Sequence, residues 1–283
     1  ALDGVERVMP VLKPYKMVAK ESHPDPAVVK IGDAEVGGDS FVVIAGPCAV
    51  ETREQTLSAT QVVADCGAQV LRGEAYKPRS SPYSFQGLGV DGLKIMAEAR
   101  EQTGRPFVAE VLDARDVEVI GEYADAFRVG ARNMANFTLL SELGTQRKPV
   151  ILKRGLTSTI EEWLLAAEYI AKGGNDSIIF CERGIRTFEP ATRFTLDISA
   201  IPVLKQETFL PVIVDPSHAA GRHYAVKPLA LASVAVGADG IMIDVHPCPE
   251  EALCDGPQAL LPDEFEDLIS HVRPMLEIVG KHL

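Results

Sequence analysis

The stretch FVVIAGPC at residues 41–48 joins an unbroken apolar run to a Gly-Pro turn and a cysteine. Short apolar runs of this kind are typical of strands that are buried on both faces of a parallel sheet. Seven more follow along the chain at a mean spacing of roughly 28 residues, which fits repeated strand–helix units. The eight runs are Phe41–Ala45, Gln69–Arg72, Phe107–Val111, Ala124–Val129, Val150–Lys153, Ser177–Cys181, Val212–Asp215 and Gly240–Asp244.

Segments with helical periodicity separate these runs. Residues 52–55 (TREQ) and 158–161 (STIE) fit the capping box that begins a helix, and Gly67 and Gly237 precede strands where a left-handed residue ends a helix. The alternation predicts a parallel sheet with right-handed crossovers, and eight units predict a closed (β/α)8 TIM barrel of the α/β class. The alternative is an open doubly wound sheet, but a glycine fingerprint after the first strand is missing.

The N-terminal region is expected to form an extension of the barrel. Residues 28–37 (VVKIGDAEVG) alternate around Gly32-Asp33, which predicts a β-hairpin that closes the bottom of the barrel. Residues 1–20 begin without methionine, and we expect them to be a linker. We therefore assign residues 1–38 to a linker and hairpin extension and residues 39–283 to the catalytic barrel.

Composition excludes several function classes. The chain has 28 basic and 40 acidic residues, a formal charge of −12, which argues against nucleic acid or an anionic membrane as a partner. No apolar run is long enough to span a bilayer, and the N-terminus lacks the layout of a signal peptide. The five cysteines have no regular spacing and are typical of reduced thiols, so we expect a cytoplasmic protein.

Polar side chains occur at the carboxyl ends of the predicted strands, where the active sites of barrels lie. Each of the eight units supplies at least one such residue, and this regularity favours a functional site over a solvated surface. They are Cys48, Arg72 with Lys77 and Arg79, Glu110, Arg132, Lys153, Arg183, His218 and Asp244.

Four residues near these ends have side chains that bind metals: Cys48, His218, Asp244 and Asp255. A thiolate, an imidazole and two carboxylates suit a divalent transition metal, of the manganese, iron, cobalt or zinc class, better than calcium or magnesium. The basic residues nearby predict an anion-binding pocket beside the ion, since arginine and lysine bind phosphate and carboxylate groups. Of the other cysteines, Cys66 is expected to pack in a helix, and Cys181, Cys248 and Cys254 are expected to be incidental. Because Cys248 and Cys254 flank the proposed metal loop, a ligand thiol from one of them is the alternative.

Seven motifs resemble those of 3-deoxy-D-arabino-heptulosonate 7-phosphate (DAHP) synthases, in particular the short microbial type related to 3-deoxy-D-manno-octulosonate 8-phosphate synthases. The resemblance runs in one colinear order from about Lys13 to the C-terminus. The motifs are GPCAVE (46–51), KPRSSP (77–82), GARN (130–133), LKRG (152–155), CERG (181–184), DPSH (215–218) and CDGPQ (254–258).

The resemblance implies a metal-dependent barrel enzyme that condenses phosphoenolpyruvate with erythrose 4-phosphate and water, releasing phosphate, in the first step of the shikimate pathway. By the matching motifs, Cys48, His218 and Asp255 are metal ligands, and Asp244 occupies the fourth ligand position. The residues that match the binding site for phosphoenolpyruvate are Arg72, Lys77, Arg132, Lys153 and Arg183, and those that match the erythrose 4-phosphate contact are Lys77, Pro78, Arg79 and Ser80. Lys77, Glu110 and a metal-bound water are the candidates for moving protons.

The chain departs from this pattern at Asp244, where the family more often has glutamate, and at Ser80, where threonine is usual. Because aspartate is one methylene shorter, we expect Asp244 to reach the metal directly or through a water. Arg128 is also unusual, and its alternation with Phe127 predicts a side chain that faces the barrel lumen.

The resemblance also bears on assembly and on alternatives. Relatives commonly form tetramers or dimers, and chorismate mutase is a possible partner. One alternative is a synthase that uses another aldose phosphate, such as arabinose 5-phosphate, although Lys77-Pro78-Arg79 favours the four-carbon sugar. The other is a non-catalytic regulatory paralogue, which would be expected to have lost ligands that this chain retains.

Overall fold

The computed structural model describes residues 13–283, so the first part of the expected linker lies outside the described residues. In this range eight parallel strands close into a barrel in the order β10-β3-β4-β5-β6-β7-β8-β9, and an antiparallel pair precedes them. The predicted TIM barrel and hairpin are confirmed. The strands are β1 (Val29–Ile31), β2 (Ala34–Val36), β3 (Val42–Gly46), β4 (Val70–Arg72), β5 (Phe107–Glu110), β6 (Ala126–Val129), β7 (Val150–Lys153), β8 (Ile178–Glu182), β9 (Val212–Val214) and β10 (Gly240–Asp244).

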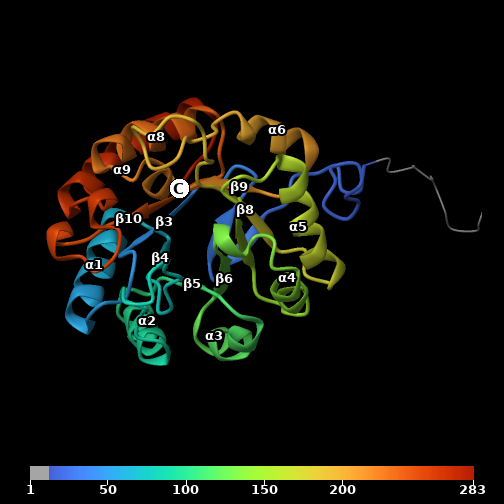
Figure 1. Cartoon of the computed structure of the whole chain (residues 1–283). Coiled ribbons are helices and arrows are strands. Elements are labelled where there is room, and N and C mark those ends of the chain that lie inside the picture. Colours follow the sequence, from blue (N-terminus) through green and yellow to red (C-terminus); the bar gives the residue numbers. More distant parts are fainter. Residues whose placement is uncertain (1–12) are drawn as a thin grey trace, which may run out of the picture.

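Helices connect successive barrel strands and form a ring around them (Figure 1). A short additional helix, α7, begins directly after β9. The helices are α1 (Arg53–Cys66), α2 (Val90–Thr103), α3 (Val117–Tyr123), α4 (Phe137–Gly144), α5 (Ile160–Lys172), α6 (Ala200–Glu207), α7 (Pro216–Ala220), α8 (His223–Ala235) and α9 (Pro262–Ile278). Between Lys13 and Leu283, none of them combines the length and the apolar character that a bilayer crossing requires.

Helix ends follow the sequence signals with one shift. Thr52 accepts a hydrogen bond from the backbone N–H of Gln55 and begins α1. The second start lies one residue later than predicted, because Thr159 has extended backbone and forms the reciprocal capping box with Glu162. Gly67 has a φ of 109°, a left-handed conformation in which it ends α1 as expected.

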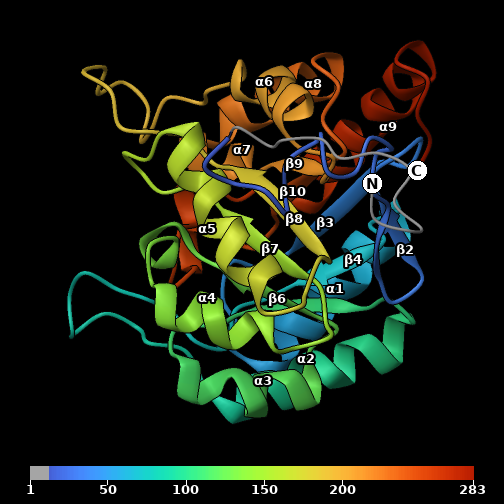
Figure 2. The same ribbon diagram turned by 90° about the vertical axis from the view of Figure 1, so that its right-hand side faces the viewer.

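The barrel lumen has an apolar layer at the bottom. Inward-facing residues of the strands, such as Ile44, Val108 and Met242, form one buried cluster with Ile31 and Val36 of the hairpin. The hairpin therefore fills the amino-terminal end of the barrel, as predicted. In Figure 2 it lies opposite the long loops that extend from the other end.

The next inward-facing residues toward the carboxyl ends of the strands include several charged side chains. These are Arg72, Glu110, Arg128, Lys153 and Asp244, and all are buried. Parallel register aligns these positions; for example, Glu110 pairs with Arg128 across β5 and β6. Since side chains alternate along a strand, the residue two positions after an apolar residue of the lower layer faces the lumen as well, and in β4, β5, β6, β7 and β10 this residue is charged.

The described part of the N-terminal extension is attached to the outside of the barrel. Backbone N–H groups of Lys16, Met17 and Val18 donate to the carboxylate of Glu168 in α5 at 2.9–3.1 Å. A single bridge also pairs Ala19 with Thr208 after α6. The chain from Lys13 onward is therefore fixed against α5 and α6.

Candidate active site

A cavity of about 290 Å³ opens at the carboxyl ends of the strands. Its wall contains seven basic and two acidic residues, although the chain as a whole carries a charge of −12. The basic residues are Lys77, Arg79, Arg128, Arg132, Lys153, Arg183 and Arg193, and the acidic residues are Glu110 and Asp255. This concentration of positive charge makes the cavity a site for an anion.

Two of these cations each have a buried nitrogen without a hydrogen-bond partner among residues 13–283. The Nη1 atoms of Arg79 and Arg183 are inaccessible to solvent and have no hydrogen-bond acceptor among residues 13–283. The Arg183 guanidinium lies 4.3 Å from the ring centroid of Phe194. Burial lowers the pKa of Arg183 to about 10, and Asp215 opposes this shift only in part. An oxyanion in the cavity would supply the missing acceptors.

Two lysines of the cavity are held by neighbouring groups. Lys77 donates from Nζ to the carbonyl oxygen of Cys48 at 3.0 Å and to its Sγ at 3.2 Å. Burial alone would lower the pKa of Lys77, but the attraction of Cys48 and Cys254 raises it above its ordinary value. Lys153, at the end of β7, donates to the carboxylate of Asp215. Both ammonium groups are therefore fixed in position.

The metal-ligand candidates converge at one side of this cavity. Cys48 Sγ lies 3.8 Å from His218 Nε2 and 3.2 Å from Asp255 Oδ2, and these last two atoms are 3.8 Å apart. Donor atoms around a tetrahedral ion with bonds of 2.0–2.3 Å are about 3.4–3.8 Å apart. The triangle therefore fits a divalent transition metal in both size and donor chemistry.

Local structure explains how this triangle forms. Asp215 caps α7 by accepting from the backbone N–H of His218 at 2.9 Å and also contacts its Nδ1 at 3.1 Å, which directs Nε2 toward Cys48. Burial lowers the pKa of His218, so the imidazole is neutral at neutral pH and can act as a ligand. Asp255 has a φ of 55°, the only non-glycine residue with positive φ in the described part of the chain. Such backbone strain is frequent at functional sites.

Asp244 lies beside this triangle but is already engaged. One carboxylate oxygen accepts from Arg72 and the other accepts from Gln258 Nε2 at 2.6 Å. Its nearest contact to the triangle is with His218 Nδ1, at 3.6 Å. Asp244 is thus brought to the metal-ligand group, but with both oxygens hydrogen-bonded to other side chains.

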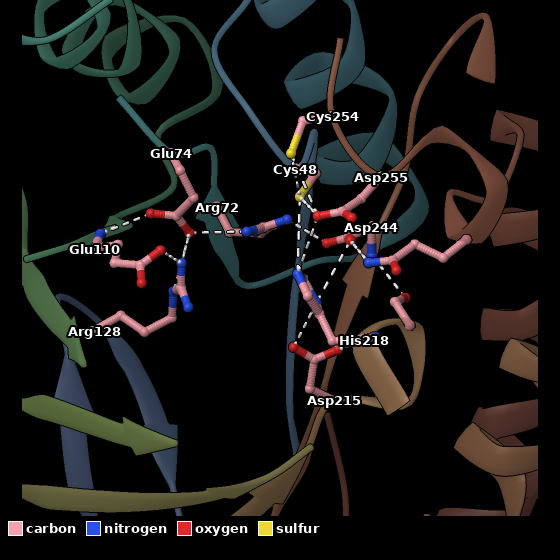
Figure 3. A network of polar contacts seen from close by, with 12 residues as sticks. Cys48, Arg72, Glu74, Glu110, Arg128, Asp215, His218, Asp244, Cys254 and Asp255 are labelled. Atoms are coloured by element: carbon pink, nitrogen blue, oxygen red, sulfur yellow. Dashed lines mark hydrogen bonds and ion pairs between the residues drawn. The ribbon is translucent and has the colours of Figure 1, made fainter. Parts of the chain in front are cut away.

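A second buried network adjoins the first through Arg72 (Figure 3). Glu74 accepts from Arg72 at 2.9 Å and from Arg128 at 3.0 Å, and Arg128 also donates to Glu110 at 2.6 Å. Burial alone would raise the pKa of Glu74, but Arg128 and Arg72 hold it well below its usual range. Arg128 faces the lumen, as its alternation with Phe127 predicted.

Glu110 also packs against Gly130, which directly follows β6. An added Cβ at Gly130 would lie 2.1 Å from Glu110 Oε1, so only glycine leaves room for this carboxylate. Together with the Arg128 contact, this packing fixes the Glu110 carboxylate at the wall of the cavity.

The structure thus brings most of the sequence-predicted residues to one place. Of the substrate-contact candidates, Arg72 does not line the cavity, because it lies fully buried between Glu74 and Asp244. The other candidates, Pro78 and Ser80 included, do line it.

Several residues of the site were missed by the sequence analysis. Glu74 could have been found from its place two residues after Arg72 on an inward-facing position. Arg193, which donates to Asp255 at 2.9 Å, and Cys254 lie in long loops where periodicity gives no signal.

Comparisons with known proteins agree with this architecture. Residues 17–279 match the model of the DAHP synthetase I family. The chain is 52% identical over 280 residues to a phospho-2-dehydro-3-deoxyheptonate aldolase of Thermotoga maritima, covering 99% of this chain and 83% of that protein. It is 30% identical over 273 residues to a 2-dehydro-3-deoxyphosphooctonate aldolase of Syntrophotalea carbinolica, covering 90% of this chain and 98% of that one.

Solved structures give the same result. The crystal structure of the Thermotoga maritima phospho-2-dehydro-3-deoxyheptonate aldolase (DAHP synthase) superimposes with a TM-score of 0.93 at 52% identity, covering 99% of this chain and 82% of that one. A truncated form of 3-deoxy-D-arabino-heptulosonate 7-phosphate synthase from Thermotoga maritima superimposes with a TM-score of 0.88 at 47% identity, covering 94% and 97% of the two chains.

Proposed function

The chain belongs to the DAHP synthetase I family, and from this we propose that it condenses phosphoenolpyruvate with erythrose 4-phosphate and water to give 3-deoxy-D-arabino-heptulosonate 7-phosphate and phosphate. This reaction is the first step of the shikimate pathway. We assign it to the barrel formed by residues 39–283, with residues 1–38 as an extension.

One observation carries the proposal: a strongly cationic cavity contains buried arginine nitrogens without acceptors among residues 13–283 and adjoins a triangle of metal-binding donors. Phosphoenolpyruvate has both a phosphate and a carboxylate, so a small volume must contain several fixed cations to bind it. Arg132, Lys153 and Arg183 line one part of the cavity and are assigned to this substrate. Arginine supplies paired donors to each oxyanion and lysine supplies a point charge.

Erythrose 4-phosphate is assigned to the part of the cavity formed after β4. Lys77, Pro78, Arg79 and Ser80 line the wall there. The buried Nη1 of Arg79 and the Ser80 hydroxyl are available to phosphate and sugar oxygens. Within this segment, Lys77 is the residue that donates to Cys48, so its ammonium group lies where the aldehyde would approach the metal site.

We propose that Cys48, His218 and Asp255 hold a divalent ion and that Asp244 contacts it directly or through a water. A bound ion of this kind supplies a Lewis acid that polarises the aldehyde oxygen. The residues of the cavity orient the two substrates so that the enol carbon of phosphoenolpyruvate faces the aldehyde carbon, and such positioning provides much of the rate acceleration.

Proton movements are assigned to two residues of the wall. Water adds to the carbon of phosphoenolpyruvate that becomes cationic when the new carbon–carbon bond forms, and this water must lose a proton. Glu110 is fixed by Gly130 and Arg128, and Lys77 is fixed by Cys48, so either group can exchange a proton at a defined place.

The test is an activity assay on protein stripped of metal by a chelator and then supplied with individual divalent metals. Phosphate release and sugar-acid formation are measured with phosphoenolpyruvate and either erythrose 4-phosphate or arabinose 5-phosphate. We expect turnover with the four-carbon sugar that returns only with metal. Faster turnover of the five-carbon sugar would favour the octulosonate synthases, and no phosphate release with any metal would favour a regulatory paralogue.

A further inference from the structure

Cys254 lies immediately beside the metal-ligand triangle. It is 5% exposed and sits in the loop between β10 and α9, next to Asp255. Its Sγ is 3.9 Å from Cys48 Sγ and 3.3 Å from Asp255 Oδ2. Cys48, Cys254 and Asp255 thus form a group of three ligand atoms within 4.8 Å of one another. Figure 3 shows the Cys254 sulfur pointing toward Cys48.

These distances fit two thiolates on one ion. Sulfur atoms bound at about 2.3 Å to a tetrahedral ion lie about 3.8 Å apart. The observed separation of 3.9 Å needs almost no adjustment to reach this value. It is therefore a separation at which one ion can bridge the two sulfurs.

Cys254 can bind an ion without losing other hydrogen bonds, whereas Asp244 cannot. Both oxygens of Asp244 accept hydrogen bonds, from Arg72 and from Gln258, and direct ligation would compete with these bonds. The contacts of the Cys254 sulfur are with Cys48 and Asp255, which are themselves candidate ligands. Among residues 13–283, the thiol has no other hydrogen-bond partner to give up when it binds an ion.

We propose that Cys254 is a direct ligand beside Cys48 and Asp255, so that the metal centre contains two thiolates. The inference rests on the proposed function in one respect: the metal that the proposed reaction uses binds at Cys48. A second soft ligand shifts the preference of the site toward zinc, and away from manganese, which prefers oxygen donors. Cys254 is thereby a residue that determines which metal the enzyme carries.

Cobalt serves as the probe, since its thiolate complexes absorb in the near ultraviolet with an intensity that increases with the number of cobalt–sulfur bonds. Metal-free protein is titrated with Co²⁺ under argon, without substrates. We expect the Cys254→Ser variant to show about half of the wild-type charge-transfer intensity. The control is Cys248→Ser, which removes a partly buried thiol of the same loop that belongs to neither ligand group, and it should match the wild type.

Two further measurements keep the test independent of folding and of turnover. X-ray absorption at the zinc edge of the unmodified protein should show two sulfur neighbours at about 2.3 Å. In competition, Cys254→Ser should lose zinc affinity relative to manganese by about tenfold or more, because even indirect partners of a metal contribute about that much. One sulfur per zinc, or equal cobalt spectra for Cys254→Ser and the wild type, would overturn the proposal. Since no substrate is present, a failure of the proposed reaction leaves these readouts unchanged.

Discussion

Replacing Arg183 by methionine should make the ligand-free protein more stable and its phosphoenolpyruvate binding weaker. The guanidinium is buried over Phe194 and its Nη1 has no acceptor among residues 13–283. Burial lowers its pKa from the ordinary value of an arginine to about 10. A cation whose pKa is lower in the folded than in the unfolded state opposes folding at every pH below the folded value.

The size of both effects follows from the structure. A difference of about 2.5 pKa units corresponds to about 3 kcal/mol. Methionine removes the charge and keeps an apolar stem over Phe194, so the free energy of unfolding should rise by up to about 3 kcal/mol. The lost charge-assisted hydrogen bonds to substrate contribute about 1.5–3 kcal/mol. The dissociation constant of phosphoenolpyruvate should therefore increase about 10- to 150-fold.

Urea unfolding in phosphate-free buffer and calorimetric titration with phosphoenolpyruvate measure the two quantities. Arg154→Met is the matched control, because Arg154 is equally buried but donates to Glu182 at 3.0 Å and to Asp197 at 2.7 Å. Its loss leaves two carboxylates unpaired and should destabilise the protein by about 3–5 kcal/mol. An Arg183→Met variant that is destabilised like the control, or that binds phosphoenolpyruvate normally, would refute the reasoning.

Three other substitutions test different parts of the structure. Glu74→Gln should lower the free energy of unfolding by about 3–5 kcal/mol at neutral pH, because it leaves two buried arginines underneutralised. Because folding lowers the pKa of Glu74, this residue stabilises the fold fully above about pH 4.3 and less in more acidic solution. Urea unfolding should therefore show that the difference in unfolding free energy between Glu74→Gln and wild type shrinks at acidic pH. A difference that does not change with pH would contradict this. Ile31→Ala, in the hairpin, should cost about 2–5 kcal/mol in the same assay, and no loss would show that the hairpin is not part of the core. Gly130→Ala should displace Glu110 and lower kcat on the order of 100-fold with unchanged circular dichroism, and a normal kcat would remove Glu110 from the proton-handling role.

The barrel and the convergence of Cys48 with His218 could be predicted from sequence for one physical reason. Eight short apolar runs alternate with helices, and parallel strands bring all their carboxyl ends to the same side. Residues far apart in the chain then meet without any knowledge of side-chain packing. The position of Arg128 followed from the same two-residue period of a strand.

Partners within the lumen could not be predicted in this way. Periodicity places Arg72 and Arg128 inside the barrel, but it does not show that both donate hydrogen bonds to Glu74. Which partners they find depends on the stagger between strands and on side-chain rotamers. Cys254 was expected to be incidental, with a thiol ligand as the alternative, because the periodicity of strands and helices does not place a loop residue beside Cys48. The capping box at Thr159 was displaced by one residue because two adjacent hydroxyl residues, Ser158 and Thr159, both fit the pattern.

The hairpin that fills the lower end of the barrel affects how solvent screens the charges in the lumen. With Ile31 and Val36 packed beneath Ile44 and Met242, the floor under the charged layer is hydrocarbon rather than water. Solvent then screens these charges from above alone, and their fields extend farther between neighbours than they would in a hydrated channel. A polar substitution that admits water to this apolar layer would therefore weaken the attraction of the substrates, although no residue of the cavity wall is changed.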